Sequence, residues 1–480
     1  MSSLKDKTIH GVSWSMIDNL SSSGITFIVG LVLARILSPI EFGILGMITV
    51  FIAVSNTIVD SGFSNALIRK IDVKDIDYNT VFYFNLLLGF LLYILLFFCA
   101  PAISNFFHEP LLIPITRVMG SVLIINAISI VQRTLFLKKV DFKTQTKISL
   151  ISSFASGILG ITMAVYGFGV WSLVGQQVSR QLLNSVFLWT YSTWRPAREF
   201  SKQSFIELFG FGSKLLLSGL IDTIYKNIYY LIIGKFYNAA QLGQYTRAEQ
   251  FNTVFSGNLT SVVQRVSYPI LSSIQGESDR LKQAYRKIIK TTMLVTFAFM
   301  LGLAAVAKPL IICLIGIKWL PAVFFIQIIC FAEMLYPLHA INLNMLQVKG
   351  RSDLFLKLEI FKKIIAVIPI TLGVFYGIEF LLWGSVLISF IAFFLNSYYS
   401  AVFVDYGTWT QIRDILPTFI VSFVVASIMW SITLLNYPIF ITLLLQCTIG
   451  VTLAIIIYEI IKLPEYIELK QIVLGVIKRN

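Results

Sequence analysis

The chain has 480 residues, of which 57% are hydrophobic and only 13% are charged, and its formal net charge is +14. Soluble domains carry about 25% charged residues, so this chain has too few polar side chains to cover a surface that faces water. A soluble enzyme, a disordered regulator and a disulfide-stapled secreted domain are therefore excluded, and an integral membrane protein remains.

Apolar segments long enough to cross a membrane, which takes about 20 residues, recur along the whole chain. The first follows a polar N-terminus and has the length of a full span, so it is not expected to be a cleavable signal peptide. The fourteen predicted spans are 11–34, 41–60, 80–102, 112–134, 148–167, 169–192, 211–234, 249–273, 291–313, 321–347, 360–377, 379–402, 415–435 and 438–461. We therefore expect an all-α polytopic membrane protein without a sizeable water-soluble domain.

The positive charges are unevenly distributed over the connections between these spans. With the N-terminus inside, 27 of the 38 Lys and Arg residues fall on the cytoplasmic side, six on the outer side and five within spans. Connections rich in Lys and Arg remain in the cytoplasm. The pattern predicts that both termini are cytoplasmic, and it explains the net charge without a nucleic-acid partner.

One sequence stretch occurs twice. Leu31–Gly43 matches Leu231–Gly243 at an offset of 200 residues, in its apolar pattern, its cation and its final glycine. Such self-similarity indicates a duplication, and chance likeness between apolar helices is the alternative. Each copy holds six spans, so the copies are parallel and related by a pseudo-twofold axis along the membrane normal. The predicted parts are an N-terminal six-helix lobe (1–194), a cytoplasmic linker (195–204), a C-terminal six-helix lobe (205–402), and helices 13–14 with a cytoplasmic tail (403–480).

Ionisable side chains inside the spans are costly and commonly face a cavity. Asp222 and Lys226 are four residues apart, acid before base, so they can pair on one helix face. Tyr225 and Tyr229 in the same span suit contacts with sugars, and an interfacial aromatic belt is the alternative. The charges could instead form salt bridges between helices or reach the interface. The remaining candidates are Asp18, Arg133, Arg180, Glu249, Arg265 and Glu333.

Several stretches carry a family likeness: Gly11–Trp14, Leu33–Gly43, Ser61–Ile68 and Phe136–Phe142. In these the chain resembles bacterial polysaccharide exporters, the Wzx-like and teichuronic-acid-exporter branch of the multidrug/oligosaccharidyl-lipid/polysaccharide superfamily. The resemblance implies a transporter, not an enzyme, in the cytoplasmic (inner) membrane. It implies that an undecaprenyl-diphosphate-linked oligosaccharide, for capsular polysaccharide, exopolysaccharide or lipopolysaccharide, is flipped to the outer leaflet by alternating access.

Depth in the membrane, rather than a family motif, selects the expected site residues. Arg suits a diphosphate because its planar fork binds two oxygens at once. The residues expected to bind the diphosphate and the sugar are Arg133, Arg265, Lys226, Tyr225 and Tyr229. Those expected to bind the coupling ion are Asp18, Asp222 and Glu333. No catalytic residue, metal site or cofactor is expected, and an H+ or Na+ gradient is the expected driving force.

The expected partners are the polyprenyl-diphosphate-linked oligosaccharide and membrane lipids, with a polysaccharide polymerase and other assembly proteins as candidates and no nucleic acid. One alternative is a MATE-like drug antiporter, which predicts an acidic cavity poor in Arg. Another is a membrane polymerase or glycosyltransferase, which needs catalytic groups on a sizeable outer loop. The outer connections here are short, which counts against an enzyme of that kind.

Overall fold

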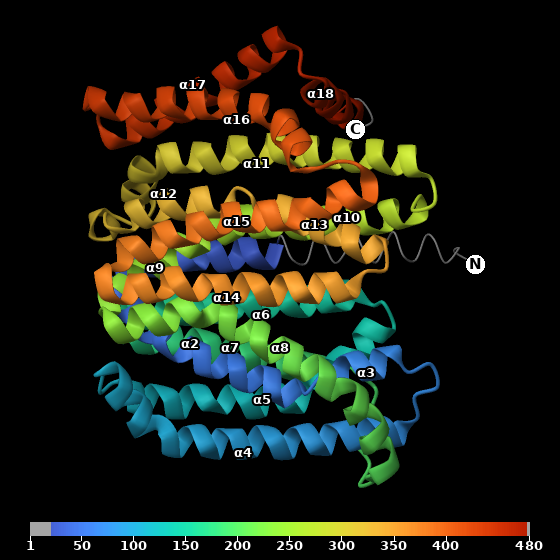
Figure 1. Cartoon of the computed structure of the whole chain (residues 1–480). Coiled ribbons are helices and arrows are strands. Elements are labelled where there is room, and N and C mark those ends of the chain that lie inside the picture. Colours follow the sequence, from blue (N-terminus) through green and yellow to red (C-terminus); the bar gives the residue numbers. More distant parts are fainter. Residues whose placement is uncertain (1–20, 478–480) are drawn as a thin grey trace. The chain divides into compact units, whose positions relative to one another are not determined.

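The computed structural model describes residues 21–477, and every regular element in that range is a helix. The first helix is Ser21–Ile36. It is followed by α2 (Pro39–Asp60), α3 (Phe63–Arg69), α4 (Asp75–Phe107), α5 (Leu112–Lys138), α6 (Phe142–Val165), α7 (Val170–Tyr191), α8 (Lys202–Phe236) and α9 (Ala239–Asn252). Figure 1 shows these helices coloured along the chain.

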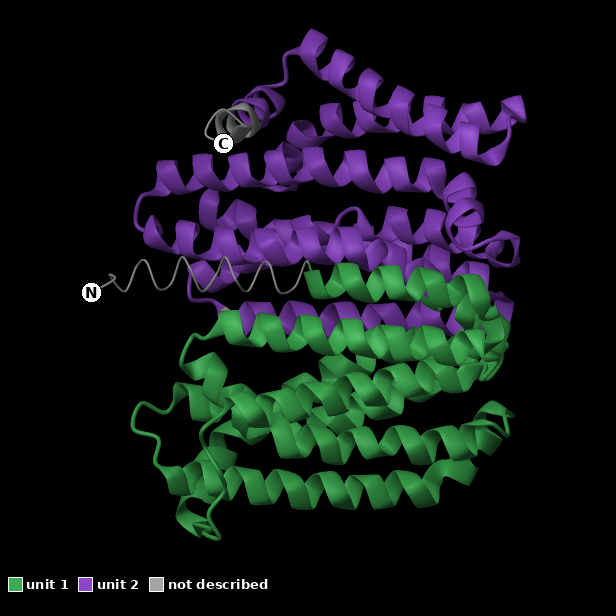
Figure 2. Ribbon diagram, turned by 180° about the vertical axis from the view of Figure 1, so that it is seen from behind, with its two compact units in different colours: residues 1–246 green, residues 247–480 purple. Residues whose placement is uncertain are grey.

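The second half of the chain continues the same pattern. A π-helical turn (Thr253–Gly257) and short 3₁₀ turns (Ile317–Trp319 and Ile432–Leu435) interrupt the helices. The helices are α10 (Asn258–Ser273), α11 (Ser278–Leu314), α12 (Ala322–Glu333), α13 (Tyr336–Val348), α14 (Ser352–Tyr376), α15 (Ile378–Val404), α16 (Thr408–Ser431), α17 (Ile439–Ile461) and α18 (Pro464–Ile477). By their internal contacts the helices form two compact units, residues 1–246 and 247–480, which Figure 2 shows in green and purple.

The helices match the spans that hydropathy predicts. Within the described residues, ten helical stretches are long and apolar enough to cross a membrane. This confirms the all-α multi-pass class. The described parts of the other four predicted segments are helical too, in Ser21–Ile36, α7, α9–α10 and α14, but these helices do not reach the same length and hydropathy. Fourteen spans therefore stay a prediction, as do the boundaries of the duplicated lobes.

The repeated stretch begins a helix at the same position in both copies. At the start of α2, the Glu41 carboxylate accepts a hydrogen bond from the Ser38 backbone N–H at 2.5 Å. At the start of α9, the Asn238 side-chain oxygen accepts one from the Gln241 backbone N–H at 2.8 Å. Polar groups at a helix start satisfy backbone donors that have no partner within the helix. A helix thus begins directly after position 38 and directly after position 238, which are 200 residues apart.

The two copies also touch each other, within the first unit. A Cβ atom added to Gly43 would lie 1.7 Å from the Ala239 carbonyl oxygen, and one added to Gly243 would lie 1.8 Å from the Pro39 carbonyl oxygen. Residues 39 and 239 correspond in the repeat, as do 43 and 243. The contact is therefore reciprocal, as around a local twofold axis. Glycine is required on both sides because small residues let helix backbones approach closely in a membrane.

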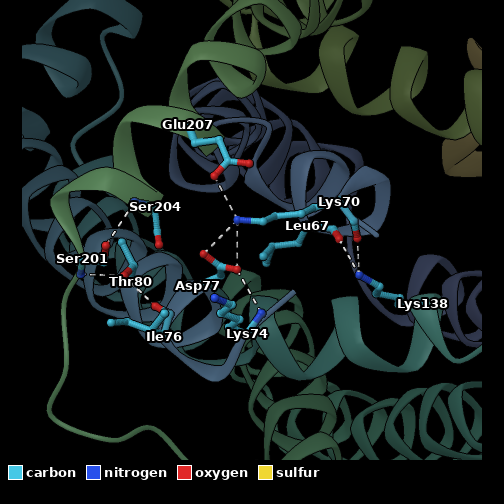
Figure 3. Close-up of polar contacts among 10 residues, drawn as sticks. All are labelled: Leu67, Lys70, Lys74, Ile76, Asp77, Thr80, Lys138, Ser201, Ser204 and Glu207. Atoms are coloured by element: carbon cyan, nitrogen blue, oxygen red, sulfur yellow. Dashed lines mark hydrogen bonds and ion pairs between the residues drawn. The ribbon is translucent and has the colours of Figure 1, made fainter. Parts of the chain in front are cut away.

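Ion pairs hold α3, α4 and α8 together at the end of the first unit that is predicted to be cytoplasmic (Figure 3). Lys70 lies between Asp77 at 3.1 Å and Glu207 at 3.0 Å, and Lys138 of α5 donates to the Leu67 carbonyl at 3.1 Å. Burial lowers the pKa of Lys70, but its bonds to Glu207 and Asp77 outweigh this, so the pKa lies above its ordinary value.

The second unit has a buried polar core of its own. The side-chain oxygen of Asn342, in α13, accepts hydrogen bonds from the Ser400 hydroxyl at 2.9 Å and the Gln411 amide at 3.1 Å. Tyr285 of α11 also donates to it. Bonds between polar side chains supply part of the helix association that hydrophobicity cannot supply in lipid. The network joins α11, α13, α15 and α16.

Candidate functional site

The first unit contains a polar cavity of about 480 Å³ between α2, α5, α6 and α7. A volume of this size is typical of a site for a small ligand or for part of a larger one. The lining residues are Ile52, Asn56, Met119, Val122, Asn126, Arg133, Gln145, Ile148, Ser149, Gln177, Arg180, Gln181, Asn184 and Leu188.

Helical periodicity aims the polar side chains of α7 into this cavity. Gln177, Arg180, Gln181 and Asn184 follow one another at intervals of three, one and three residues. Residues three, four and seven positions apart share one face of a helix. On α5, Asn126 and Arg133 are seven residues apart and share a face in the same way. The polar stripe of α7 therefore faces inward, although its helix is apolar enough to be predicted as a span.

The cavity is cationic. Arg133 and Arg180 line it, and among the described residues of the lining there is no Asp or Glu. The Arg133 side chain is exposed and yet surrounded by protein atoms, which is the state of a group that reaches into a wet internal space. Asp60 interacts with it electrostatically from outside the lining. The sequence predicts Arg133 as a site residue, and the structure places it in the wall of this cavity.

Three amide side chains form a hydrogen-bonded relay across the cavity wall. The Asn126 Nδ2 group donates to Asn56 Oδ1 at 2.6 Å, and the Gln181 Nε2 group donates to Asn126 Oδ1. The relay joins α2, α5 and α7. Nearby, the Gln145 side chain donates to the Arg133 backbone carbonyl at 3.3 Å, which ties α6 to α5. Asn126 and Gln181 stand close to the midpoints of their helices.

A second, smaller cavity of about 360 Å³ adjoins the first at Asn56. It lies between α2, the start of α3 and the first half of α8. Asp60 is part of its wall and accepts a hydrogen bond from the Ser64 hydroxyl. Its other lining residues are Thr57, Gly62, Asn65, Leu215, Leu216 and Gly219.

The predicted site residues on α8 lie apart from both cavity walls. Lys226 and Asp222 form the predicted ion pair at 2.8 Å, with 64% and 46% of their side chains exposed. The Tyr229 ring stacks on Tyr245 at a centroid distance of 6.1 Å. Tyr225, Asp222, Lys226 and Tyr229 are absent from the lining of either cavity. Their roles in binding stay predictions.

The remaining predicted residues lie elsewhere in the chain. Arg265, on α10, and Glu333, at the end of α12, belong to the second unit, where Arg265 is exposed and Glu333 is half-buried. Asp18 lies outside the described residues. Among the described residues of the first unit, Arg133 is thus the one predicted site residue that lines either of the two cavities.

Sequence reasoning missed the amides of the cavity wall. A search for costly charges inside spans finds Arg133 and Arg180 but passes over neutral polar residues. The signal is nevertheless present, because Gln177, Gln181 and Asn184 recur at helical spacing around Arg180. Amide side chains that share one face of a membrane helix need hydrogen-bonding partners inside the helix bundle, because lipid tails supply none.

Fold and cavity together define a multi-pass membrane protein with polar space between its helices, the architecture of a transporter. The chain belongs to the family of polysaccharide biosynthesis proteins, whose family model matches residues 32–324. This confirms the resemblance seen in the sequence motifs.

Relatives with assigned roles cover much of the chain. The chain is 27% identical to the teichuronic acid biosynthesis protein TuaB of Bacillus subtilis, over 74% of each chain. It is 26% identical to the lipopolysaccharide biosynthesis protein WzxC of Escherichia coli, over 77% of this chain and 76% of that protein. It is 25% identical to the succinoglycan biosynthesis transport protein ExoT of Rhizobium meliloti, over 65% and 64%.

Solved structures share the fold at low sequence identity. The lipid II flippase MurJ, in an inward closed conformation, superposes with a TM-score of 0.72 at 15% identity, over 94% of this chain and all of that chain. A multidrug resistance MATE family transporter in an inward-facing conformation superposes with a TM-score of 0.59 at 16% identity, over 87% and 96%. Both likenesses confirm the polytopic helical fold.

Proposed function

We propose that the protein moves a polyprenyl-diphosphate-linked oligosaccharide from the inner to the outer leaflet of the cytoplasmic membrane by alternating access. Relatives named for teichuronic acid, lipopolysaccharide and succinoglycan biosynthesis support a role in polysaccharide export. A structural neighbour that is a lipid II flippase supports a lipid-linked cargo. The expectation that the chain is a transporter and not an enzyme agrees with its family and with these neighbours.

The observation that carries the proposal is that two arginines, Arg133 and Arg180, line one polar cavity of the first unit. A diphosphate and sugar hydroxyls are expensive to bring into hydrocarbon unless the protein supplies polar partners. Arginine binds phosphate oxygens through two parallel hydrogen bonds. Arg133 and Arg180 can therefore stabilise the diphosphate inside the membrane, while the polyprenyl tail remains in lipid. Arg265 and Lys226 stay candidates for the same role.

A drug or small-cation antiporter is the second candidate, because a MATE transporter shares the fold. Such a cargo requires acidic groups where it binds. Arg133 and Arg180 in the larger cavity of the first unit present positive charge to it, which disfavours a cationic cargo there. The charge of this cavity therefore favours an anionic head group.

Transport against a gradient needs an energy source, and we propose an H+ or Na+ gradient. Asp222 and Glu333, with Asp18, are the proposed coupling carboxylates. Cytoplasmic termini follow from the excess of Lys and Arg in the connections predicted to lie inside. A polysaccharide polymerase in the same membrane is a proposed partner, because a flipped repeat unit must next be polymerised.

The test is flipping of undecaprenyl-diphosphate-linked oligosaccharide in liposomes that hold the purified protein. Arg133→Gln and Arg180→Gln are expected to lose at least tenfold in rate, and Arg133→Lys less, because charge is kept while the planar fork is lost. Arg198→Gln is the matched control, because Arg198 is an exposed arginine of the same unit outside both cavities. Unchanged flipping by both cavity variants would overturn the assignment.

A further inference from the structure

The relay of Asn56, Asn126 and Gln181 has a property that single amides lack. In a chain of side-chain amides each carbonyl accepts from the next NH₂ group, so one end must present a donor and the other an acceptor. In this structure Asn56 Nδ2 is the donor end and Gln181 Oε1 the acceptor end. Neither end atom makes a hydrogen bond within the described part of the chain, and both residues line the cavity.

Two more amides extend this surface along α7. Gln177 lies one turn before Gln181, and Asn184 lies nearly one turn after it, both in the cavity lining. We call Asn56, Asn126, Gln177, Gln181 and Asn184 the amide wall. The wall is neutral, and each of its side-chain amides carries both an NH₂ donor and a carbonyl acceptor. A sugar ring presents hydroxyl groups that both donate and accept, which is the matching chemistry.

The amide wall lies beside the two arginines. Arg180 immediately precedes Gln181 on α7, and Arg133 follows Asn126 by seven residues on α5. Seven residues of α-helix correspond to about 10 Å along the axis. One lining thus holds an anion-binding part and a hydroxyl-binding part that a diphosphate and the sugar bonded to it can reach together.

We propose that the amide wall recognises the sugar linked directly to the diphosphate and so determines which lipid-linked saccharides the protein accepts. This inference rests on the proposed function. In this proposal the arginines bind the diphosphate, which all such lipids have in common. The amides bind the first sugar, which differs between them. A site built to hydrogen-bond hydroxyls rejects a ligand that lacks them, because its own polar groups then stay unpaired.

The rival explanation is that the amides only hold the helices together. A binding measurement on the purified protein in nanodiscs distinguishes sugar recognition from a purely structural role of the amides. The probes are undecaprenyl diphosphate and undecaprenyl-diphosphate-linked hexose. Gln177→Met and Gln181→Met are expected to weaken binding of the hexose-bearing lipid about tenfold, and to leave binding of the sugar-free lipid within about twofold. Gln177 has no hydrogen bond in the relay, so its variant tests recognition without breaking the relay.

The matched control is Gln176→Met, because Gln176 belongs to the same helix but packs against Gly160 outside the cavity lining. It should bind both probes as the wild type does. Equal effects of the Gln177 and Gln181 variants on both probes, or no effect on either, would overturn the inference and leave the proposed function standing. A wild-type protein that binds neither probe would overturn the proposed function itself.

Discussion

Replacing Gly43 by alanine should destabilise the protein, because the new methyl group has no space. Its Cβ would lie 1.7 Å from the Ala239 carbonyl oxygen and 2.5 Å from the carbonyl carbon. The obstacle is backbone, so no side-chain rotation relieves it, and α2 and α9 must separate. Overpacking of this kind costs about 3 kcal/mol, and the better helix propensity of alanine returns about 1 kcal/mol.

The expected net loss is about 2 kcal/mol, a shift of about 30-fold in the unfolding equilibrium. It can be measured as the free energy of unfolding of the purified protein in mixed micelles. Gly210→Ala on α8 is the control, because its Cβ would meet no atom within 4 Å. That variant should be as stable as the wild type or slightly more stable.

The reciprocal geometry makes a sharper prediction for the double variant. Gly243→Ala should cost a similar amount, since its Cβ would lie 1.8 Å from the Pro39 carbonyl oxygen. Once α2 and α9 have separated to accommodate the methyl group of one alanine, the methyl group of the second alanine requires less additional separation. The double variant should therefore lose less stability than the sum of the single losses. A stable Gly43→Ala protein, or strictly additive losses, would refute the reasoning.

Two further predictions concern ion pairs of the first unit. Lys70→Met should cost about 2 kcal/mol, because it leaves the buried Asp77 carboxylate without its cation, although the Lys74 backbone N–H still donates to Asp77 at 3.0 Å. Glu207→Gln, at an exposed partner, should cost less than about 1 kcal/mol. The folded-state pKa of Lys70 lies above its ordinary value of 10.5 and that of Asp77 lies below its ordinary value of 3.8. The contribution should therefore be complete at neutral pH, and be lost in strong alkali as Lys70 deprotonates and in strong acid as Asp77 is protonated. Chemical denaturation of wild type and each variant at several pH values measures the contribution of the ion pair. Equal stability of wild type and Lys70→Met at neutral pH would contradict a stabilising role for Lys70. Asp222→Asn, at a half-exposed pair, should change stability by less than about 0.5 kcal/mol but abolish the dependence of flipping on the ion gradient. Gradient dependence that survives this change would exclude Asp222 as the coupling group.

Those features of the fold that depend on local pattern could be predicted from the sequence. Hydropathy located the helical segments, and the four-residue spacing of Asp222 and Lys226 predicted an ion pair that the structure confirms. The duplicated stretch seen in the sequence begins a helix after residue 38 and again after residue 238, although the boundaries of the duplicated lobes stay a prediction.

Features that depend on tertiary pairing could not be predicted. Nothing in the sequence says that Gly43 lies against Ala239, because two equivalent helices can be placed in many ways around an axis. The amide wall was missed for a different reason. Amides cost less than charges in a membrane, so a search by desolvation cost ranks Gln181 below Arg180 although both face one cavity.

The net charge of +14 is a poor guide to the electrostatics of transport, because cations at the predicted cytoplasmic helix ends have partners of their own. On α11, Arg286, Lys287 and Lys290 pair with Asp414, Glu468 and Glu465. Lys138 donates to carbonyl groups at the end of α3, where the helix dipole is negative. Inside the cavity, Arg133 and Arg180 share the lining with the neutral amides of α2, α5 and α7. A diphosphate there responds to two arginines at membrane depth, where the dielectric is low and salt screens little. Neutralising a surface cation should therefore alter stability first, whereas neutralising either cavity arginine should alter transport first.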